Sequence, residues 1–551
     1  MTPTAPRGQQ SRRTRGRRAA AALVSAPLLW FTPAAAVPAG AATVTPADIH
    51  QADTYRAGAD PAERADGLRA DIDAILADPM LEGATSGVVV TDAVTGEVLY
   101  SEEAGTRLLP ASNMKPFTTA AALQVLGADH TFGTEAVVER RPGRGAVDEL
   151  YLVGGGDPAL DGADLYAMAA EVAASGVTSV GDLYADDSWF DDERLVDDWW
   201  PEDEPYAYSA QISALTVAHG DRHDTGVTEV TVTATGDGEP VSVDPGAAAG
   251  YVELDNRAVT GSAGGEDTLV VDRPVGTNTI EVTGSLPVDA GPRVVLRTVD
   301  EPAGLAGHLF AQALEEHGVA VGGEVAQAEV PDEWHRPRVV AEHTSPPLEE
   351  LLVPLVKFSN NGHAEMLVKS IGREVSGEGA WGAGLAAQEA ALRDLGVDTS
   401  DLVLTDGSGL SRGNRVTADT VVDLLARAQE APWYEVWHHS LPVAGDSDPF
   451  VGGTLARRMG GTPAAGAVQA KTGTMTGVSA LSGYVQGPGG ELYFSVVNNG
   501  HSGYAPTRVQ DAIAVRLAEH LGNRIPEQAA LSRHGAVAGG GELECSWELT
   551  C

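Results

Sequence analysis

Segments predicted to share one β-sheet lie at opposite ends of this 551-residue chain. Near the N-terminus, two short apolar runs flank a Thr-Gly turn, which is typical of a β-hairpin, and a helical pattern follows. Near the C-terminus, three strand-like runs precede a last helical pattern. The predicted segments are residues 61–76 (helix), 87–91 and 97–100 (hairpin), 110–126 (helix), 468–474, 478–485 and 492–498 (strands) and 508–521 (helix). We therefore predict an α+β fold, in which both ends of the chain contribute to an antiparallel sheet with helices packed on it.

The middle of the chain has a different composition, which predicts inserted domains. Residues 226–286 are rich in Thr, Val and Gly and alternate with period two, as in a small all-β domain. Helical patterns at 165–174 and 305–317 flank this segment, and the whole chain is too long for one compact core. We therefore predict one domain nested in a second, which is itself inserted into the first. The predicted boundaries are 1–41 (signal peptide), 60–139 and 339–525 (first domain), 140–225 and 288–338 (inserted domain II), 226–287 (inserted small β domain III) and 526–551 (C-terminal tail).

The first 50 residues are typical of an export signal. Five arginines within residues 12–18 precede an apolar run over residues 19–31, and small residues follow. The run is shorter than the ~20 residues that a membrane span needs, and Pro27 interrupts it. Cleavage fits at residues 34–36 or at residues 39–41, and a twin-arginine route is an alternative to ordinary export. We expect a secreted mature chain with no transmembrane anchor.

The two cysteines of the chain, Cys545 and Cys551, follow a Gly-rich stretch at the extreme C-terminus. In an oxidising compartment they could close a small loop. Their position excludes a disulfide in the core.

The charged residues exclude one class of function and single out four positions. With 78 acidic and 36 basic residues, the formal net charge is −42, which repels nucleic acid and anionic lipid. Among the basic residues, only Lys115, Lys357, Lys369 and Lys471 are lysines. A GC-rich genome replaces lysine by arginine wherever only charge is needed. A retained lysine is therefore a candidate for proton chemistry, because arginine does not give up its proton.

The first candidate motif lies at the start of the helix predicted from Pro110. Ser112 and Lys115 are three residues apart, so they lie on one helix face within reach of each other. A helix N-terminus stabilises developing negative charge, and a neutral lysine can take the serine proton in place of the histidine of a triad. Because the same spacing also arises by chance, the motif alone leaves both interpretations open.

Two further motifs have a functional and a structural interpretation each. The Lys-Thr-Gly sequence at residues 471–473 begins a predicted strand, where an ammonium and a hydroxyl suit a carboxylate and glycine admits a close ligand. The alternative is an edge lysine that prevents aggregation. The Ser-Asn-Asn sequence at residues 359–361 could relay a proton and hold a peptide group, or it could cap a helix.

Taken together, the motifs resemble those of a known superfamily. Ser112-x-x-Lys115, Ser359-x-Asn361 and the Lys-Thr-Gly sequence at 471–473 match the three active-site signatures of penicillin-interacting serine DD-peptidases and β-lactamases. Four longer segments resemble more closely the D-Ala-D-Ala carboxypeptidases/endopeptidases of the low-molecular-mass class C penicillin-binding group, peptidase family S13, and within it the actinomycete exocellular DD-peptidases. These segments are residues 154–158, 208–215, 357–361 and 406–412, and the resemblance covers about residues 60–525.

This resemblance implies a fold, an activity and partners. The first domain would be a β-lactamase-like catalytic domain with an antiparallel five-stranded sheet flanked by helices, plus two nested inserted domains. The implied activity is that of a secreted, cell-wall associated serine DD-peptidase that needs no cofactor and no metal. Its substrate would be a peptidoglycan stem peptide that ends in D-Ala-D-Ala and carries diaminopimelate, and β-lactam antibiotics would acylate it.

The resemblance also assigns catalytic roles. Ser112 would attack the carbonyl of the penultimate D-alanine with Lys115 as general base, and the N–H groups of Ser112 and Thr474 would form the oxyanion hole. Ser359, aided by Lys471, would pass the proton to the leaving D-alanine.

Other residues would hold the substrate. Thr472 and Thr474, with Lys471, would bind the terminal carboxylate beside Gly473, and Asn361 would hold the acyl amide.

In actinomycete-like members, a side-chain pocket grips the two charged ends of diaminopimelate. The matching positions here are Trp200, Asp203, Tyr208, Leu410, Arg412 and Met475. Asp203 would meet the ammonium group and Arg412 the carboxylate. Because Asp203 lies in a strongly acidic stretch, a plain surface position is the alternative.

Competing functions fit the sequence less well. A class A β-lactamase would carry Glu-x-x-Leu-Asn between Ser359 and Lys471, which is not found, and its first two motifs lie close together, whereas here 359 − 112 = 247 residues intervene. A non-catalytic β-lactam-sensing or wall-binding protein would tolerate the loss of Lys115 or Lys471. His219, His223 and Asp224 have spacing that could bind a metal, but they lie in a polar stretch with no clear third ligand for a zinc site.

Overall fold

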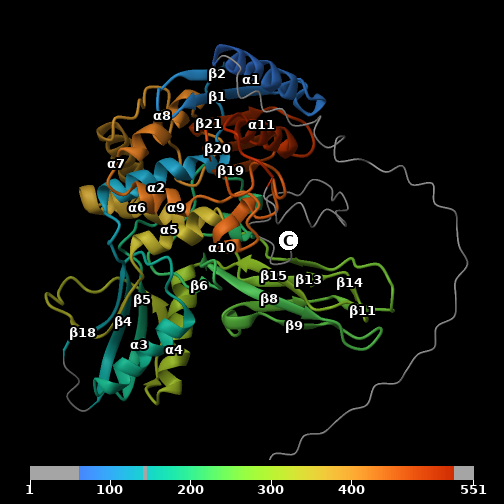
Figure 1. Ribbon diagram of the computed structural model, residues 1–551. Helices are drawn as coiled ribbons and strands as arrows, with labels where there is room; N and C mark the ends of the chain where they lie inside the picture. The colour runs from blue at the N-terminus through green and yellow to red at the C-terminus, as the bar shows by residue number, and fades with distance from the viewer. Residues whose placement is uncertain (1–60, 141–144, 526–551) are drawn as a thin grey trace, which may run out of the picture. The chain divides into compact units, whose positions relative to one another are not determined.

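The computed structural model describes residues 61–140 and 145–525 (Figure 1). The predicted signal peptide, its cleavage positions and both cysteines lie outside these residues. Within the described part, no helix is long and apolar enough to cross a membrane.

Both ends of the chain build one five-stranded antiparallel sheet, in the order β19-β20-β21-β1-β2 (Figure 1). Its strands are β1 (Thr85–Asp92), β2 (Val98–Glu102), β19 (Val468–Met475), β20 (Val478–Gly487) and β21 (Gly490–Asn499). Strand β1 pairs with β21 from Thr85↔Asn499 to Asp92↔Leu492. The prediction of a sheet shared by the two ends of the chain is therefore confirmed.

Helices cover both faces of this sheet, because successive side chains of a strand point to opposite faces. Val88 and Val90 of β1 pack with α1 (Pro61–Leu76) and α11 (Thr507–His520), whereas Val89 packs on the opposite side. The helices on that side are α2 (Lys115–Val125), α5 (Leu348–Lys357), α6 (Asn361–Ser376), α7 (Trp381–Asp394), α8 (Ala418–Gln429) and α9 (Tyr434–Ser440).

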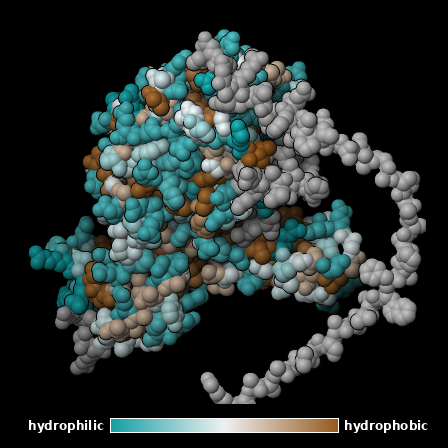
Figure 2. Space-filling model, in the orientation of Figure 1, coloured by the Kyte–Doolittle hydropathy of each residue, from teal (hydrophilic) through white to brown (hydrophobic). Residues whose placement is uncertain are grey.

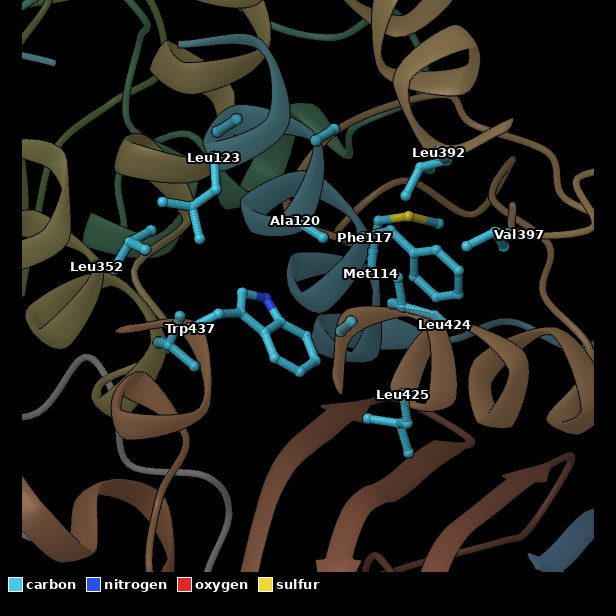
Figure 3. Packing of buried hydrophobic residues seen from close by; sticks show 14 of the residues in the cluster. Met114, Phe117, Ala120, Leu123, Leu352, Leu392, Val397, Leu424, Leu425 and Trp437 are labelled. Carbon is cyan, nitrogen blue, oxygen red and sulfur yellow. The ribbon is translucent and has the colours of Figure 1, made fainter. Parts of the chain in front are cut away.

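Helix α2 lies in the middle of the larger core (Figure 3). Phe117 and Ala120 of α2 are completely buried and lie near Trp437 of α9 and Leu424 of α8. This packing fixes the start of α2, where Ser112 and Lys115 are found. A short helix, α10 (Pro449–Gly452), follows α9.

The segment between residues 133 and 344 forms separate sheets. A six-stranded sheet has the order β16-β5-β4-β3-β18, with β17 also pairing with β5, and it contains both parallel and antiparallel pairs. The helices predicted at 165–174 and 305–317 are present as α3 (Gly162–Ala174) and α4 (Pro302–Glu316), and both pack on this sheet. Its strands are β3 (Gly133–Val138), β4 (Ala146–Gly154), β5 (Ser179–Asp186), β16 (Ala320–Val321), β17 (Val325–Gln327) and β18 (Arg338–Thr344).

Short strands between residues 218 and 298 confirm the predicted all-β insert. They form small sheets of order β15-β8-β9, β10-β13-β12, β11-β14 and β6-β7. The strands are β6 (Ala218–His219), β7 (Asp224–Thr225), β8 (Val227–Thr233), β9 (Ser242–Asp244), β10 (Glu253–Asn256), β11 (Val259–Gly261), β12 (Val270–Asp272), β13 (Thr279–Thr283), β14 (Ser285–Pro287) and β15 (Arg293–Thr298). Strand β15 begins after residue 287 but pairs with β8 of the predicted small β domain. Strand β3 ends before residue 140 but pairs with β4, which lies in the predicted domain II. The domain boundaries given above stay a prediction.

The face of the protein seen in Figure 2 is mostly hydrophilic, with apolar residues scattered among polar ones. This agrees with the net charge of −42, because a strongly charged surface stays solvated.

Candidate active site

Ser112 lies in a 3₁₀ turn, η2 (Ala111–Met114), directly before α2. The prediction of one continuous helix from Pro110 is therefore wrong in its first turn. Ala111 has a φ of 47°, which is outside the right-handed helical region, so α2 begins only at Lys115. Residues three apart eclipse each other in a 3₁₀ turn, and Lys115 Nζ donates a hydrogen bond to Ser112 Oγ at 3.0 Å.

Lys115 is completely buried and joins three separate segments. Besides Ser112, its Nζ donates to Asn361 Oδ1 at 2.6 Å and to the carbonyl oxygen of Ser408 at 2.9 Å. Asn361 is the first residue of α6, and its Nδ2 donates to the carbonyl oxygen of Tyr208 at 2.7 Å. The Ser-x-x-Lys and Ser-x-Asn motifs therefore meet at one amine.

Ser359 lies at the corner between α5 and α6 with a φ of 62°, an uncommon conformation for a residue with a side chain. Lys471 of β19 is completely buried, and its Nζ donates to Ser359 Oγ at 2.9 Å and to the carbonyl oxygen of Thr472 at 2.9 Å. The interpretation of the triplet as a helix cap also holds, because the Asn360 side chain accepts a hydrogen bond from the His363 N–H. A second Ser-Lys pair is thus built from two distant segments.

Gly473 allows β19 to run directly beside the Ser112 turn. A Cβ at this position would lie 2.8 Å from the carbonyl oxygen of Pro110 and 3.1 Å from the nitrogen of Ser112. Asn113 Nδ2 donates to the carbonyl oxygen of Lys471 at 3.0 Å and ties the same two segments together. The Thr472 hydroxyl donates to the Thr454 hydroxyl at 2.8 Å.

A cavity of about 440 Å³ contains most of the predicted site. The predicted residues that line it are Ser112, Trp200, Asp203, Tyr208, Ser359, Asn361, Leu410, Arg412, Thr474 and Met475. The other four predicted residues, Lys115, Lys471, Thr472 and Gly473, do not line it. Both lysines still reach it through the serine hydroxyls to which they donate.

The predicted side-chain pocket brings opposite charges into this one cavity. Tyr208 Oη donates to Asp203 Oδ1 at 2.8 Å, and burial raises the pKa of Tyr208 well above its usual value, so its hydroxyl stays a donor. The Arg412 guanidinium lies 4.7 Å from the Trp200 ring centre and donates to the carbonyl oxygen of Thr476 at 3.0 Å. Asp203 therefore lines the same cavity as Arg412, and its role in holding an ammonium group stays a prediction.

The sequence analysis missed several residues of the cavity wall. These are Asp198, Gly409, Thr476, Gly477, His501, Gly503, Tyr504 and Ala505. Asp198 and Gly409 lie next to or inside segments that were singled out, and residues 476–477 form the turn that directly follows the Lys-Thr-Gly strand. The loop at 501–505 carried no motif in the sequence. It reaches the cavity because it directly follows the end of β21. Across the described ranges, no three His, Cys, Asp or Glu side chains are grouped so as to hold a metal ion.

These features together define a class of protein. A five-stranded antiparallel sheet between helices carries one Ser-Lys pair at the start of a buried helix and a second pair from a helix corner and an edge strand. This is the fold and site of the serine penicillin-binding peptidases and β-lactamases.

Comparison with known proteins identifies the family within this class. Residues 68–520 match the D-Ala-D-Ala carboxypeptidase 3 (S13) family. The chain is 66% identical over 556 residues to the D-alanyl-D-alanine carboxypeptidase of Actinomadura sp. (strain R39), with 100% of both chains covered. The chain therefore belongs to the S13 family of serine D-Ala-D-Ala carboxypeptidases, as predicted from its motifs.

Two further comparisons agree. The carboxypeptidase DacB of Mycolicibacterium smegmatis is 30% identical, over 82% of this chain and 84% of that protein. The crystal structure of penicillin-binding protein 4 (DacB) from Haemophilus influenzae has a TM-score of 0.71 at 24% identity, and covers 82% of this chain and 99% of that one. A second structure of the same protein, complexed with a β-lactam, has a TM-score of 0.66. These likenesses confirm the predicted fold.

Proposed function

We propose that this carboxypeptidase is secreted and trims peptidoglycan stem peptides through an acyl-enzyme on Ser112. The observation that carries the proposal is the arrangement around Lys115 Nζ. Asn361 Oδ1 and the Ser408 carbonyl accept from the Lys115 amine, and Ser112 Oγ lies 3.0 Å away. A neutral amine has two N–H groups and one lone pair. In the protonated amine, the third N–H donates to Ser112 Oγ; in the neutral amine, the two acceptors keep the N–H groups and the lone pair accepts from the Ser112 hydroxyl.

In the acylation step, Lys115 takes the proton of the Ser112 hydroxyl while Ser112 Oγ bonds to the carbonyl carbon of the penultimate D-alanine. The negative charge on the carbonyl oxygen is stabilised by the backbone N–H groups of Ser112 and Thr474. Gly473 supports this assignment, because it lets the strand that carries Thr474 approach the Ser112 turn.

In the second half of acylation, the C–N bond breaks and the leaving D-alanine needs a proton. Ser359 gives its proton to the leaving nitrogen and is reprotonated through Lys471, to which it is hydrogen-bonded. Thr474, which lines the cavity, and the positive charge of Lys471 behind the wall hold the carboxylate of the leaving residue, and Thr472 joins them once its hydroxyl turns from Thr454 toward the cavity. In deacylation, water bonds to the ester carbonyl carbon and passes a proton through Ser359 back to Lys471, while the C–Oγ bond breaks and Ser112 Oγ takes back the proton held by Lys115.

Substrate selection is assigned to the side-chain pocket. Diaminopimelate has a free ammonium and a free carboxylate at the end of its side chain. Asp203 suits the ammonium, and Arg412, which is oriented by Trp200 and the Thr476 carbonyl, suits the carboxylate. Leu410 and Met475 line the apolar part of the same cavity.

β-Lactams are proposed to acylate Ser112 and to remain attached, because their ring carbonyl presents the same reaction centre. A related structure that contains a β-lactam supports this assignment. A β-lactamase would release the antibiotic quickly, and a non-catalytic receptor would bind it without releasing D-alanine. Steady release of D-alanine from peptides, together with slow loss of bound penicillin, separates the proposed enzyme from both alternatives.

The experiment that tests the nucleophile compares the mature protein with its Ser112→Ala variant. The substrate is a diaminopimelate peptide that ends in D-Ala-D-Ala, and free D-alanine and covalent penicillin labelling are measured. Ser440→Ala is the control, because Ser440 is a buried serine whose hydroxyl donates to the Trp437 carbonyl and does not line the cavity. We expect the control to retain activity and Ser112→Ala to lose both reactions. Equal D-alanine release by Ser112→Ala would contradict the proposal.

A second variant tests the pocket. Arg412→Ala should reduce kcat/KM for the diaminopimelate peptide about tenfold or more, but should change cleavage of a plain acylated D-Ala-D-Ala far less. Arg427→Ala is the control, because Arg427 pairs with Asp423 on the surface of α8. An equal loss on both substrates would refute the pocket assignment.

A further inference from the structure

One face of α6 connects the proposed active site to the segments around it. Asn361, Glu365 and Lys369 are spaced four residues apart, so they lie on the same side of the helix. Asn361 contacts Lys115, Glu365 contacts the backbone at 407–408, and Lys369 contacts Asp191 and the carbonyl of Glu193. The helix thus joins the Lys115 amine to two other parts of the chain.

Glu365 is the unexplained member of this row. Its side chain is completely buried and does not line the cavity. Both carboxylate oxygens accept hydrogen bonds: from the Ser408 N–H at 2.7 Å, from the Gly407 N–H at 3.0 Å and from Trp381 Nε1 at 2.8 Å. Burial, reinforced by nearby Asp406, raises the pKa of Glu365 to about 7. A buried carboxylate is costly to place, so three donors on one group indicate a specific task.

The backbone of Ser408 connects Glu365 to the proposed general base. Its N–H donates to Glu365 Oε1, and its carbonyl oxygen accepts from Lys115 Nζ at 2.9 Å. By holding the N–H of Ser408, the Glu365 carboxylate therefore also restricts the position of the Ser408 carbonyl oxygen.

The loop around Ser408 has no room to move toward either neighbour. A Cβ at Gly407 would lie 2.4 Å from Val368 Cγ2, and a Cβ at Gly409 would lie 1.8 Å from the carbonyl oxygen of Ala111. The loop is therefore wedged between α6 and the residue before Ser112. Glu365 accepts from the N–H groups of Gly407 and Ser408, while the Thr118 hydroxyl donates to the Gly407 carbonyl and Asp406 accepts from the Gly409 N–H. Among these contacts, only those of Glu365 hold the N–H of Ser408 itself.

We propose that Glu365 is a positioning residue for acylation, which holds the Ser408 carbonyl against Lys115 Nζ so that the amine lone pair faces Ser112. The inference rests on the proposed role of Lys115 as general base. Glu365 is not itself the base for a water or a serine, because it lies behind the cavity wall and N–H groups occupy both of its oxygens.

The test uses Glu365→Gln, which keeps the shape of the side chain. At the Oε1 position the amide nitrogen meets the Ser408 N–H, and at the Oε2 position it meets the Gly407 N–H and Trp381 Nε1, so at least one contact is lost and the loop shifts. The control is Asp157→Asn, because Asp157 is equally buried but lies beside His343 and outside the cavity. A second variant, Trp381→Phe, removes one donor to Glu365 and keeps the aromatic ring beside Lys369.

Labelled penicillin gives two separate readouts: the acylation rate constant at saturation, and the final number of labels per chain. For Glu365→Gln we expect the rate constant to fall about tenfold to a hundredfold, since small misplacements of reacting groups have effects of that size. The final labelling should stay at one per chain, and the half-saturating penicillin concentration should change less than about threefold. Trp381→Phe should show a smaller loss of the same kind, and Asp157→Asn should show none.

Three results would overturn the inference. They are a rate constant within twofold of the wild type in both variants, a loss that appears as fewer labelled chains instead of slower labelling, and an equal loss in Asp157→Asn. If Glu365→Gln does not fold, Trp381→Phe decides by the same criteria. A wild-type protein that is not labelled at Ser112 would instead refute the proposed function, so the two failures are distinguishable.

Discussion

The four lysines of this chain are all buried, yet they form two pairs with different surroundings. Lys115 and Lys471 each donate to a serine hydroxyl that lines the cavity. Lys357 donates to the carbonyl oxygens of Leu441 and Val451. Lys369 donates to Asp191 and lies 4.0 Å from the Trp381 ring centre. In this lysine-poor chain, each retained lysine therefore has a buried amine. The two proposed catalytic lysines differ from the other two because their amines contact a serine hydroxyl.

The two serine-linked lysines differ from each other as well. The Ser112–Lys115 pair is local, three residues apart in one turn, and its amine has two further acceptors from distant segments. The Ser359–Lys471 pair is formed only when α6 and β19 come together, 112 residues apart in sequence. In the proposed mechanism, the first pair removes a proton from the nucleophile and the second pair supplies one to the leaving group. Substitutions that keep the charge but not the ability to lose a proton test this difference.

The largest effect is expected for Lys115→Arg, compared with Lys369→Arg. Both replacements put a larger, permanently charged group into a buried site, so their cost in packing is similar. Only the first removes the proposed base, and acylation by penicillin should fall at least about a thousandfold, in the range of general base catalysis. Lys369→Arg should lower the melting temperature but leave the acylation rate within a few-fold of the wild type. Similar rates for the two variants would remove the distinction between the lysine pairs.

A smaller effect is expected for Lys471→Arg. A guanidinium keeps the positive charge for the substrate carboxylate and can still donate to Ser359, but its shape differs from that of the ammonium. The acylation rate should fall about tenfold to a hundredfold, and KM should rise for peptides with a free terminal carboxylate more than for their amides. A loss as large as that of Lys115→Arg would show that both lysines must give up or accept a proton directly.

The sequence predicted the scaffold well because each of its elements has its own periodic pattern. The helix at 61–76 and the strands at both ends appear where they were expected, since alternation and helical spacing are local properties. The turn at Ala111 was missed. Its left-handed conformation follows from the packing of Gly409 and Gly473 against this turn, and neither glycine is near it in sequence.

The site was predictable to the extent that its residues belong to recognisable motifs. Ser112, Ser359 and Lys471 were found in this way, and the structure brings all three together. Glu365 carried no signal, because a single glutamate in a helix is normally on the surface. Only the tertiary structure, which places Ser408 over this side chain, reveals its contacts. Residues that act through the backbone of another segment are thus the ones that sequence reasoning misses.

The smallest effect concerns Lys357 and tests the other lysine pair through stability. Burial lowers the pKa of Lys357 from 10.5 to about 8. In the unfolded chain this amine stays protonated up to about pH 10.5, so between pH 8 and 10.5 the unfolded state binds more protons than the folded state. The contribution of Lys357 to the free energy of unfolding therefore rises with pH across this window, by up to about 3 kcal/mol, and is lost as the pH falls through about 8.

Urea unfolding of the wild type and of Lys357→Met at pH 7.5, 9 and 10.5 measures this contribution. Methionine fills the same space but binds no proton, and it leaves the carbonyls of Leu441 and Val451 without their donor at every pH. The unpaired carbonyls give a constant offset, whereas the titration of Lys357 gives a slope, so the difference between the two proteins should grow in favour of the wild type as the pH rises. A difference that does not change with pH would mean that the Lys357 amine keeps its proton in the folded protein. In that case, burial would not lower the pKa of an amine that donates to carbonyl oxygens. The two lysine pairs would then differ only in whether the amine contacts a serine hydroxyl.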